Sequence, residues 1–402
     1  MHPPSTRAAA LDRLRAFAPC VAAYTADRNH VMPGHPNVSC LSPAIRHRLV
    51  LEEEVIAAAR EAHRPHACAK FVEEVLWRTY WKGWLEQRSG VWVSYVRGVE
   101  RHRSSLPLSV LRRVEAVAAG QSGVAVMDAF ARELIDTGFM HNHARMWWAS
   151  FWIHVERLPW ELGAAHFMRH LLDADPASNT LSWRWVAGLH TKGKAYLVRR
   201  SNIESFLSPE LRRDRTGLDQ LDDACVEAAD LTDDADVTRH PIESLGGEVS
   251  PSGRRVGLWL HEDDLVPEVG ELAACRPVAV GGWLEQGDGA ASQRSHRLAA
   301  LNDGRARASA HFGCEATGGE ATSMAEAMAA WIAEKGLDQV VAFAPFAGPL
   351  GDSLPTVAKA AAAAGARLTL MRRAWDRRLF PLSTGGFFGF REKAMGLLNA
   401  RG

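Results

Sequence analysis

Two short segments in the first half of the chain carry polar residues at spacings that could do chemistry together. Asn142 and Arg145 are three residues apart, so on a helix they would share one face. About thirty residues later come Asp173, Asp175 and Asn179. A buried arginine needs a carboxylate partner, and Asp173 is a natural candidate to pair with Arg145. This combination predicts a buried polar cluster built from two separate helices.

A pair of tryptophans, Trp183 and Trp185, follows four residues after Asn179. Each of these pieces also has an ordinary explanation. Asp175-Pro176 is typical of a helix start, an Asn and an Arg on a helix usually face solvent, and paired tryptophans usually pack in a core. The order and spacing of all the pieces together favour one functional site over several unrelated features.

In this order the segments resemble the FAD-binding domain of the photolyase and cryptochrome family. That family has a T-G-aromatic-M-H-N-x-x-R-M segment, then D-x-D-x-x-x-N, then W-x-W. Two upstream pieces are similar to its SRLSP turn and its NELIWRE helix, and Tyr24 and Arg28 stand about where the family has a Tyr-x-x-x-Arg. The matching stretches are 39–43, 73–78, 137–146, 173–179 and 183–185. The resemblance covers roughly residues 10–205.

FAD is the cofactor that the resemblance implies. Ser39 and Ser42, just ahead of a helix, would offer hydroxyl and amide donors to its pyrophosphate. Asp175 would accept from the imide edge of the flavin, and Asn179 would face the ring nitrogen N5, where an amide can hydrogen-bond but cannot supply a proton as an acid would. The implied cofactor-binding residues are Tyr24, Ser39, Ser42, Asn142, Arg145, Asp173, Asp175 and Asn179.

The function that the resemblance implies is light-dependent DNA repair, a lyase reaction that splits cyclobutane pyrimidine dimers by electron transfer from photoexcited reduced FAD. The partner would be DNA that carries such dimers. A flipped-out dimer is flat and apolar, so Trp77 and Trp185 would suit it as walls, and Glu74 would supply a polar contact. The implied catalytic residues are Glu74, Trp77, Asn142, Met146, Asn179 and Trp185.

Two other functions stay open, a cryptochrome-like blue-light photoreceptor and a flavin-binding module that has lost both roles. The presence of Glu74, Trp77 and Trp185 favours repair, because a pure sensor has no need of an aromatic lesion pocket. Basic residues around this pocket would bind the flanking phosphates, with ordinary surface charge as the alternative. They are Arg78, Lys82, Arg184, Lys192 and Lys194.

Electron transfer in the family runs along three tryptophans, and Trp183 and Trp160 match the inner two positions. The outermost position aligns with Pro107, which cannot donate an electron. Trp148 and Trp152 lie at helical spacing near Trp160 and are candidates for the missing donor, with core packing as an equal alternative.

Several features depart from the family pattern. Arg46-His47-Arg48 stands where the family has a glycine, and the loop 190–202 is more basic and lacks prolines. Only three cysteines fall in this part of the chain, so we expect no iron–sulfur cluster. The family places an α/β antenna domain before the helical domain, whereas here an α/β pattern follows it.

The elements that must position these residues change character along the chain. Residues 1–205 predict an all-α photolyase-type domain, with helices over 43–63, 67–88, 108–119, 124–137, 142–156 and 161–171. Residues 206–252 form an acidic, Gly-rich linker, part of which we expect to be mobile. Residues 253–402 predict a smaller, Rossmann-like three-layer α/β domain with strands at 256–260, 277–280, 339–344 and 367–371 and helices at 323–335 and 354–364.

The α/β domain has two interpretations, a rearranged antenna domain or an unrelated partner domain. The segment 343–348 leaves a strand where such folds bind ligands, and the Gly- and Phe-rich segment 380–390 would line a pocket or pack against the helical domain. The sequence favours the absence of a second, antenna chromophore, and it leaves the oligomeric state open.

Composition is that of a globular protein. The 402 residues are 47% hydrophobic and 23% charged, with 47 basic and 47 acidic side chains. Residues 1–200 hold 26 basic and 18 acidic residues, a net +8, and ten of the 14 tryptophans. We see no apolar run long enough to cross a bilayer and no secretory signal, and no two of the six cysteines form a CxxC pair. We therefore expect a reducing, cytoplasmic compartment and no membrane partner.

Overall fold

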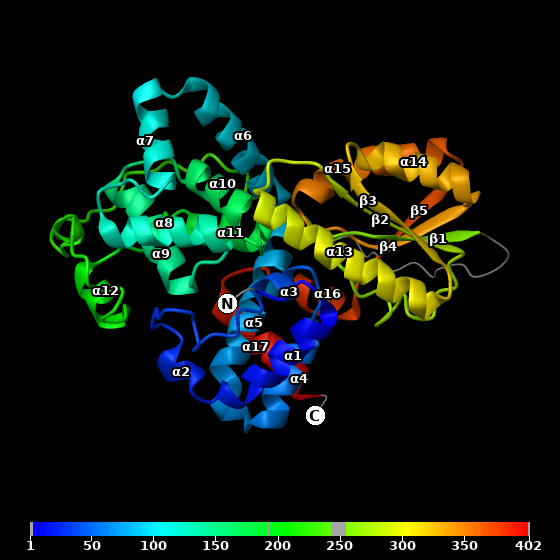
Figure 1. Ribbon diagram of the computed structural model, residues 1–402, viewed down its shortest axis with the longest axis horizontal. Coiled ribbons are helices and arrows are strands. Elements are labelled where there is room, and N and C mark those ends of the chain that lie inside the picture. Colours follow the sequence, from blue (N-terminus) through cyan, green and yellow to red (C-terminus); the bar gives the residue numbers. More distant parts are fainter. Residues whose placement is uncertain (1–2, 192, 243–254, 401–402) are drawn as a thin grey trace.

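The computed structural model describes residues 3–191, 193–242 and 255–400, and it divides the chain into a helical part and an α/β part (Figure 1). The helical part contains α1 (Arg7–Phe17), α2 (Tyr24–Asp27), α3 (Ser42–Arg46), α4 (Glu52–Ala62), α5 (Pro65–Glu86), α6 (Ser89–Ser105), α7 (Leu108–Ala118), α8 (Ala125–Thr137), α9 (Asn142–Ser150), α10 (Trp160–His170), α11 (Pro176–Val186) and α12 (Arg200–Phe206). A π-helical turn, Phe151–Val155, extends α9. The predicted all-α character of this part is confirmed.

Sequence signals account for the helices that surround the site. Asp175 caps α11 by accepting a hydrogen bond from the Ser178 amide, and Pro176 occupies the first turn. Gly138 ends α8 in the left-handed region at φ 67°, where a side chain would be strained. The long helix α5 is buried along most of its length and contacts α4, α6 and α11. It is the element around which the helical part is packed.

The predicted single helix over 43–63 is wrong. The chain forms α3, breaks at residues 47–51, and starts again as α4, where the Leu51 amide donates to Glu54 Oε2 at 2.8 Å. At the break Arg48 has φ 52°, a left-handed conformation that is uncommon for residues other than glycine. Long-range ion pairs of Arg48 hold this conformation. Four helices of this part, α1, α2, α6 and α12, were not foreseen.

The α/β part is a five-stranded parallel sheet in the order β3-β2-β1-β4-β5. Its elements are β1 (Val256–Leu260), β2 (Ala279–Glu285), α13 (Ala291–Phe312), β3 (Glu315–Ala321), α14 (Met324–Lys335), β4 (Gln339–Phe343), α15 (Pro349–Ala363) and β5 (Arg367–Met371). Helix α13 covers one face of the sheet, while α14 and α15 pack together on the other. The first three strands are added toward one edge of the sheet, and after β3 the chain crosses back to add β4 and β5 on the other side of β1. Right-handed crossovers therefore put the later helices on the opposite face of the sheet. The predicted parallel α/β architecture is confirmed, although α13 and β3 were missed.

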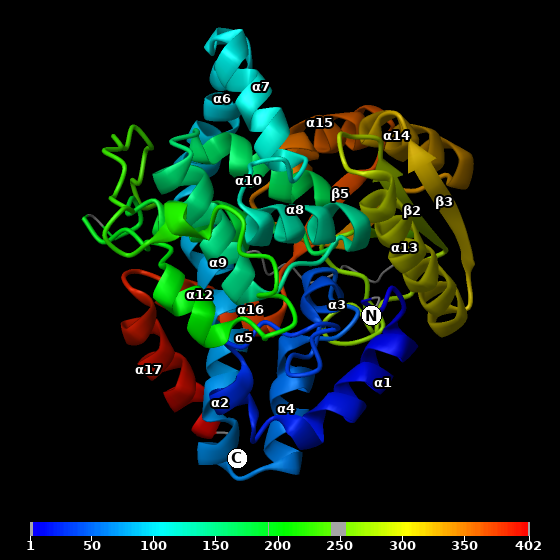
Figure 2. The same cartoon turned by 60° about the vertical axis from the view of Figure 1, so that its left-hand side comes forward.

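The end of the chain does not belong to the sheet, so the predicted α/β segment 253–402 is wrong in its last part. After β5 the chain leaves the sheet and forms α16 (Ala374–Leu379) and α17 (Phe387–Asn399), which both contact α5. Figure 2 shows α17 next to α5, on the helical side of the molecule. Aromatic side chains explain this placement, because Phe387 and Phe390 are buried against α5 residues such as Tyr80.

The first part of the predicted linker is packed along the helical part. Leu221 and Val226 are buried, the Ala229 amide donates to His154 Nδ1 at 3.0 Å, and Arg200 pairs with Asp222. Residues 243–254, where the glycines of the predicted linker are concentrated, lie outside the described residues. Asp222, Asp233 and Asp234 of the described part therefore serve as partners for basic side chains of the helical part.

Buried ion pairs join α3 and the turn after it to the segments that follow β1 and β5. Arg46 Nη1 lies 2.6 Å from Asp263 Oδ1, and Arg48 lies 3.1 Å from Asp264 and 2.6 Å from Asp376. Burial alone would raise the pKa of Asp264, but Arg373 and Arg48 outweigh it and hold that pKa at about 2. These pairs occupy the edge of the sheet where an open α/β fold usually binds its ligand.

No helix in the described ranges is long and apolar enough to cross a membrane.

Histidines buried at this interface give a pH-dependence prediction. His47 on the α3–α4 break and His296 on α13 face each other with ring centroids 6.1 Å apart, and burial lowers their pKa values to about 3 and about 4. An unfolded histidine titrates near 6.5, so the unfolded chain binds these protons first as the pH falls. Stability should be complete above about pH 6.5 and should decrease between about pH 6.5 and pH 4.

His296→Gln removes one of these groups and should reduce the slope of unfolding free energy against pH by up to about 1.4 kcal/mol per pH unit in that window. Urea unfolding of parent and variant at several pH values between 7 and 4 measures the difference. Parallel pH profiles for the two proteins would contradict the interface burial described for His296.

Candidate active site

A cavity of about 470 Å³ opens into the helical part between α2, α5, α9 and α11. Its wall contains all eight residues predicted to bind the cofactor and all six predicted to be catalytic. They are Tyr24, Ser39, Ser42, Glu74, Trp77, Asn142, Arg145, Met146, Asp173, Asp175, Asn179 and Trp185. The structure thus brings every one of these side chains to one space, although their roles stay predictions.

Two buried aspartates form the charged side of the cavity. Arg145 Nη1 donates to Asp173 Oδ2 at 3.0 Å, which is the pairing that the sequence predicted. Burial alone would raise the pKa of Asp173, but Arg145, Arg78 and a hydrogen bond from Ser42 outweigh it and lower that pKa. Asp173 is therefore a carboxylate at neutral pH, and its pair with Arg145 gives this side of the cavity a fixed geometry.

Asp175 has three cations around it. Arg78 Nη1 lies 3.3 Å from Asp175 Oδ2, Lys82 Nζ lies 3.9 Å from the same oxygen, and Arg46 adds to the positive field. Burial raises the pKa of Asp175, but these three cations together lower it below its usual value. The Asp175 carboxylate is thus an ionised acceptor at the edge of the cavity.

Asn179 lies on the first turns of α11, above Asp175. Its Nδ2 donates to the Ala164 carbonyl on α10 at 2.9 Å, which fixes the orientation of the amide. Across the cavity, Asn142 Nδ2 lies 4.0 Å from Met146 Sδ on the same face of α9. The cavity therefore has the oriented amide of Asn179 on one side and the amide of Asn142 with the thioether of Met146 on the other.

Two tryptophans, Trp77 and Trp185, form aromatic walls of the cavity, and each stacks on a second aromatic ring. Trp77 stacks face to face on Phe387 of α17, with centroids 3.6 Å apart and planes 8° apart. Trp185 stacks on Tyr196 with centroids 5.5 Å apart. Each indole is therefore held by packing on one side while it lines the cavity. Phe387 and Tyr196 were not among the predicted site residues.

Glu74 stands beside Trp77 between two cations. Arg28 Nη1 lies 3.4 Å and Lys70 Nζ 3.5 Å from Glu74 Oε1. Arg28 also lines the cavity, and its buried Nε has no hydrogen-bond partner among the described residues. A buried donor of this kind is costly unless something accepts from it, so it points to an anionic or polar ligand in the cavity.

The cavity fits the chemical character of a flavin nucleotide. Hydroxyls of Tyr24, Ser39 and Ser42 and the Arg28 guanidinium suit a pyrophosphate, whereas Asp175 suits a ring imide. The apolar lining suits a flat aromatic system and is contributed by Phe71, Trp77, Trp81, Phe139, Met140, Phe167 and Trp183. This combination of polar donors, an ionised acceptor and apolar side chains fits FAD.

The prediction of DNA binding is wrong for three residues, because their side chains lie inside the protein. Arg78 points into the cavity and donates to the Ser42 carbonyl at 2.9 Å. Lys82 has a side chain only 2% exposed, its Nζ lies 4.1 Å from the Phe346 ring, and burial lowers its pKa. Arg184 is 3% exposed and pairs with Asp233 of the acidic segment at 2.6 Å. Lys192 lies outside the described residues, and Lys194 is exposed as expected.

The tryptophans predicted for electron transfer fall into two groups. Trp183 lies edge-on to Trp148 and Trp152, at centroid distances of 6.1 and 6.5 Å. Trp148 and Trp152 are fully buried, as the packing alternative expects, and their role as electron donors stays a prediction. The ring contact of Trp160 is with Tyr95, 5.7 Å away. The step from Trp183 to Trp160 stays a prediction.

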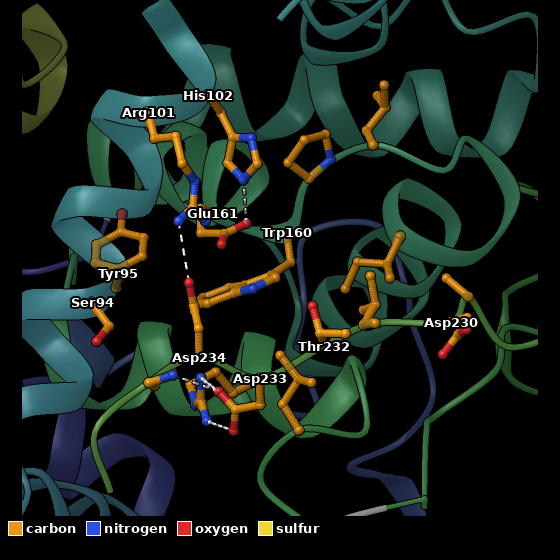
Figure 3. A pocket seen from close by; sticks show the side chains of 18 of the residues that line it. Ser94, Tyr95, Arg101, His102, Trp160, Glu161, Asp230, Thr232, Asp233 and Asp234 are labelled. Atoms are coloured by element: carbon orange, nitrogen blue, oxygen red, sulfur yellow. Dashed lines mark hydrogen bonds and ion pairs between the residues drawn. The ribbon is translucent and has the colours of Figure 1, made fainter. Parts of the chain in front are cut away.

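A second pocket, of about 420 Å³, opens next to Trp160 (Figure 3). The acidic segment 229–235 forms one wall, and Tyr95, Arg101 and His102 of α6 form another. Polar contacts border it, with Arg101 3.2 Å from Asp234 and His102 3.4 Å from Glu161. Trp160 and Tyr95 thus border an opening, whereas Trp183 is in the core.

Comparison with known proteins bears on the same region. Residues 71–211 match the family model described as the FAD binding domain of DNA photolyase. The chain is 36% identical over 154 residues to a deoxyribodipyrimidine photo-lyase of Streptomyces griseus, a match that covers 38% of this chain and 32% of that protein. It is 27% identical over 267 residues to a deoxyribodipyrimidine photo-lyase of Synechococcus sp., covering 61% of this chain and 49% of that protein.

The chain therefore spans about a third to a half of the length of these two relatives. Among solved structures, it is similar to a bacterial class III photolyase from Agrobacterium tumefaciens with a TM-score of 0.42 and 26% identity, over 52% of this chain and 44% of that one.

Flavin binding should depend on the Asp175 carboxylate. Asp175→Asn keeps a residue that can cap α11 but replaces the charged carboxylate with a neutral amide, and the weaker hydrogen bond to the ring imide costs about 1–3 kcal/mol. We expect FAD to bind roughly 5- to 150-fold more weakly, measured by flavin fluorescence titration at a temperature where circular dichroism shows both proteins folded. Asp128→Asn, in the first turn of α8 and not among the residues that line the cavity, is the matched control. Equal FAD affinity of Asp175→Asn and parent would refute this assignment.

The position of Trp183 predicts that alanine substitutions at two helical glycines change the stability of the protein in opposite directions. A Cβ at Gly163 of α10 would overlap the rigid Trp183 ring and lie 3.0 Å from Trp152, whereas a Cβ at Gly396 of α17 meets nothing within 4 Å. Gly396→Ala should therefore stabilise the protein by up to about 1 kcal/mol through helix propensity. Gly163→Ala should destabilise it by about 1–3 kcal/mol through overpacking. Urea unfolding measures the free energy of unfolding of both variants and the parent. A gain in stability for both variants would mean that Trp183 is not packed against α10.

Proposed function

We propose that this protein, whose residues 71–211 match the model of the FAD binding domain of DNA photolyase, binds FAD and uses blue light to split cyclobutane pyrimidine dimers in DNA. The observation that carries the proposal is the joint lining of one cavity. Groups suited to a flavin, Asp175 and Asn179, share it with Trp77, Trp185 and Glu74, which suit a flat lesion. A site that only bound and sensed light through a flavin would not need the second set.

When bound and reduced, FAD would supply the light-absorbing electron donor for ring splitting. The chain supplies position and surroundings. Asp175 and the Arg145–Asp173 pair orient the polar edge of the cofactor, and Asn179 offers a hydrogen bond without an acidic proton. No proton transfer from these three groups is needed for the lyase reaction.

Substrate recognition falls to the outer half of the cavity. Trp77 and Trp185 would contact the flat faces of the dimer and exclude water from it, each held by the ring behind it. Glu74, in ion pairs with Arg28 and Lys70, would accept hydrogen bonds from the edges of the flipped bases. Because a pyrimidine edge offers N–H donors, an ionised carboxylate is a suitable partner.

Phosphate contacts must come from side chains that reach the surface. Arg78, Lys82 and Arg184 are internal, and Lys194 of the loop after α11 is the exposed member of the predicted set among the described residues. Lys70 and Arg391, each about a third exposed, lie beside Glu73 next to the cavity and extend the basic rim. The net charge of +8 on residues 1–200 supports DNA as the partner.

The test is light-dependent repair. Purified protein, loaded with FAD and chemically reduced, should restore dimers in a synthetic oligonucleotide to pyrimidines under blue light and not in the dark. Glu74→Gln should lower the repair rate at subsaturating DNA about 10- to 100-fold, because a hydrogen bond to a charged group is worth about 1.5–3 kcal/mol. Glu115→Gln, at an exposed position on α7, is the matched control.

Loss of repair in the parent, with FAD bound and photoreduced normally, would exclude the lyase function and favour the photoreceptor alternative. Absence of FAD binding would exclude both.

A further inference from the structure

Lys82 of α5 is a buried cation to which the proposed function gives no task. Its side chain is 2% exposed, and its Nζ has no hydrogen-bond partner among the described residues. An ammonium group carries three donors, and burying it without an acceptor is costly. The charged atom nearest to it in an ion pair is Asp175 Oδ2, 3.9 Å from Nζ. The reason for a lysine at this position is therefore to be found in the chemistry around Asp175.

The charges beside Asp175 do not cancel. Arg78 Nη1 donates to Asp175 Oδ2 at 3.3 Å and already neutralises this carboxylate. Arg46, which also lies near, has its own carboxylate partner in Asp263 at 2.6 Å. Lys82 is a further cation, and within the described ranges its ion-pair partner is Asp175 alone. One carboxylate and two cations leave this side of the cavity with a net charge of +1.

The α/β part encloses the Lys82 ammonium from the other side. Phe346, in the segment after β4, has its ring centroid 4.1 Å from Nζ, which is a cation–π contact. The Phe346 amide donates to Asp263 Oδ2 at 2.8 Å, and this bond fixes the segment. A Cβ on Gly348 would lie 2.6 Å from Pro176 Cγ, so the same segment packs against the first turn of α11. The ammonium is therefore held in place behind the cavity wall.

A net positive charge distinguishes between ligands by their charge. The flavin ring is neutral when oxidised, and its polar edge gains negative charge on reduction. Attraction to a cation behind Asp175 is therefore stronger for the reduced form, and a buried setting screens this attraction less than water does. Burial lowers the pKa of Lys82, and Asp175 opposes this effect. An anion that arrives at the same edge favours the charged ammonium in the same way.

We propose that Lys82 is a positioning residue that makes the cavity select reduced over oxidised FAD. Its charge, acting across Asp175, stabilises the negative charge of the reduced cofactor and so raises the reduction potential of bound FAD. Lys82 is not among the residues that line the cavity, so it acts without touching the cofactor. The inference rests on the proposed function, because it requires FAD in this cavity. It also gives the α/β part a share in the flavin chemistry, since Phe346 holds the ammonium.

The experiment measures the reduction potential of bound FAD in the parent and in Lys82→Met, by anaerobic titration against a reference dye. Methionine keeps the length of the side chain and removes its charge. At a fixed potential, the ratio of reduced to oxidised bound FAD should fall about tenfold, which is a shift of about 30 mV for a two-electron couple. Lys82→Gln, which is polar but uncharged, should give the same fall.

Two controls separate the charge from the packing. Lys82→Arg keeps the charge, so its ratio should stay within about threefold of the parent. Lys359→Met removes a lysine at an exposed position of α15, outside the cavity lining, and should leave the ratio unchanged. An unchanged ratio in both Lys82→Met and Lys82→Gln, or an equal fall in Lys82→Arg, would overturn the role of the charge while the proposed function stands.

A second readout needs no flavin chemistry. Without FAD, Lys82→Met should unfold at the same or a higher urea concentration than the parent, because it replaces a buried cation that lacks a hydrogen-bond partner with an apolar side chain. With oxidised FAD, the affinity of Lys82→Met should stay within about threefold of the parent, because the added negative charge is absent. A parent protein that binds no FAD would reject the proposed function, and this inference with it.

Discussion

The buried pairs of Arg46 with Asp263 and of Arg48 with Asp264 and Asp376 determine how the rest of the molecule is arranged. Taking these charges out of water is costly, and the cost is offset only if each partner stays in place. The same turn that carries Arg46 and Arg48 also carries Ser42 and lines the cavity. Docking of the α/β part therefore sets the position of the cavity wall on the phosphate side.

This constraint also explains what the α/β part does in the described structure. The carboxyl ends of β1 and β4, where open parallel sheets usually bind ligands, are occupied by side chains from α3 and α5. The sheet serves here as a support for the helical part. Its last strand leads into α16 and α17, which return to α5 and place Phe387 behind Trp77. One continuous set of contacts thus connects the interdomain ion pairs to the aromatic wall.

Much of the site was predictable because its residues lie on helices whose spacing directs them to one face. Arg145 and Asp173 paired as expected, and Asp175 capped α11. The basic residues failed because charge alone does not reveal burial, and partners such as Asp233 for Arg184 are distant in sequence. The break at Arg48 was hidden for the same reason, since two of its carboxylate partners, Asp264 and Asp376, are 216 and 328 residues away in the sequence. The Trp77–Phe387 stack joins α5 to the last helix, and no local pattern shows such a pairing.

The account as a whole holds that one cavity receives both a flavin and a flipped dimer, with the last helix completing its wall. A crystal structure of the protein with FAD and a dimer-containing duplex tests this most directly. The account predicts the flavin ring against Asp175, Asn179 and Trp183, and the dimer between Trp77 and Trp185 with the Phe387 stack intact. A dimer bound elsewhere on the surface, or a flavin outside this cavity, would contradict it.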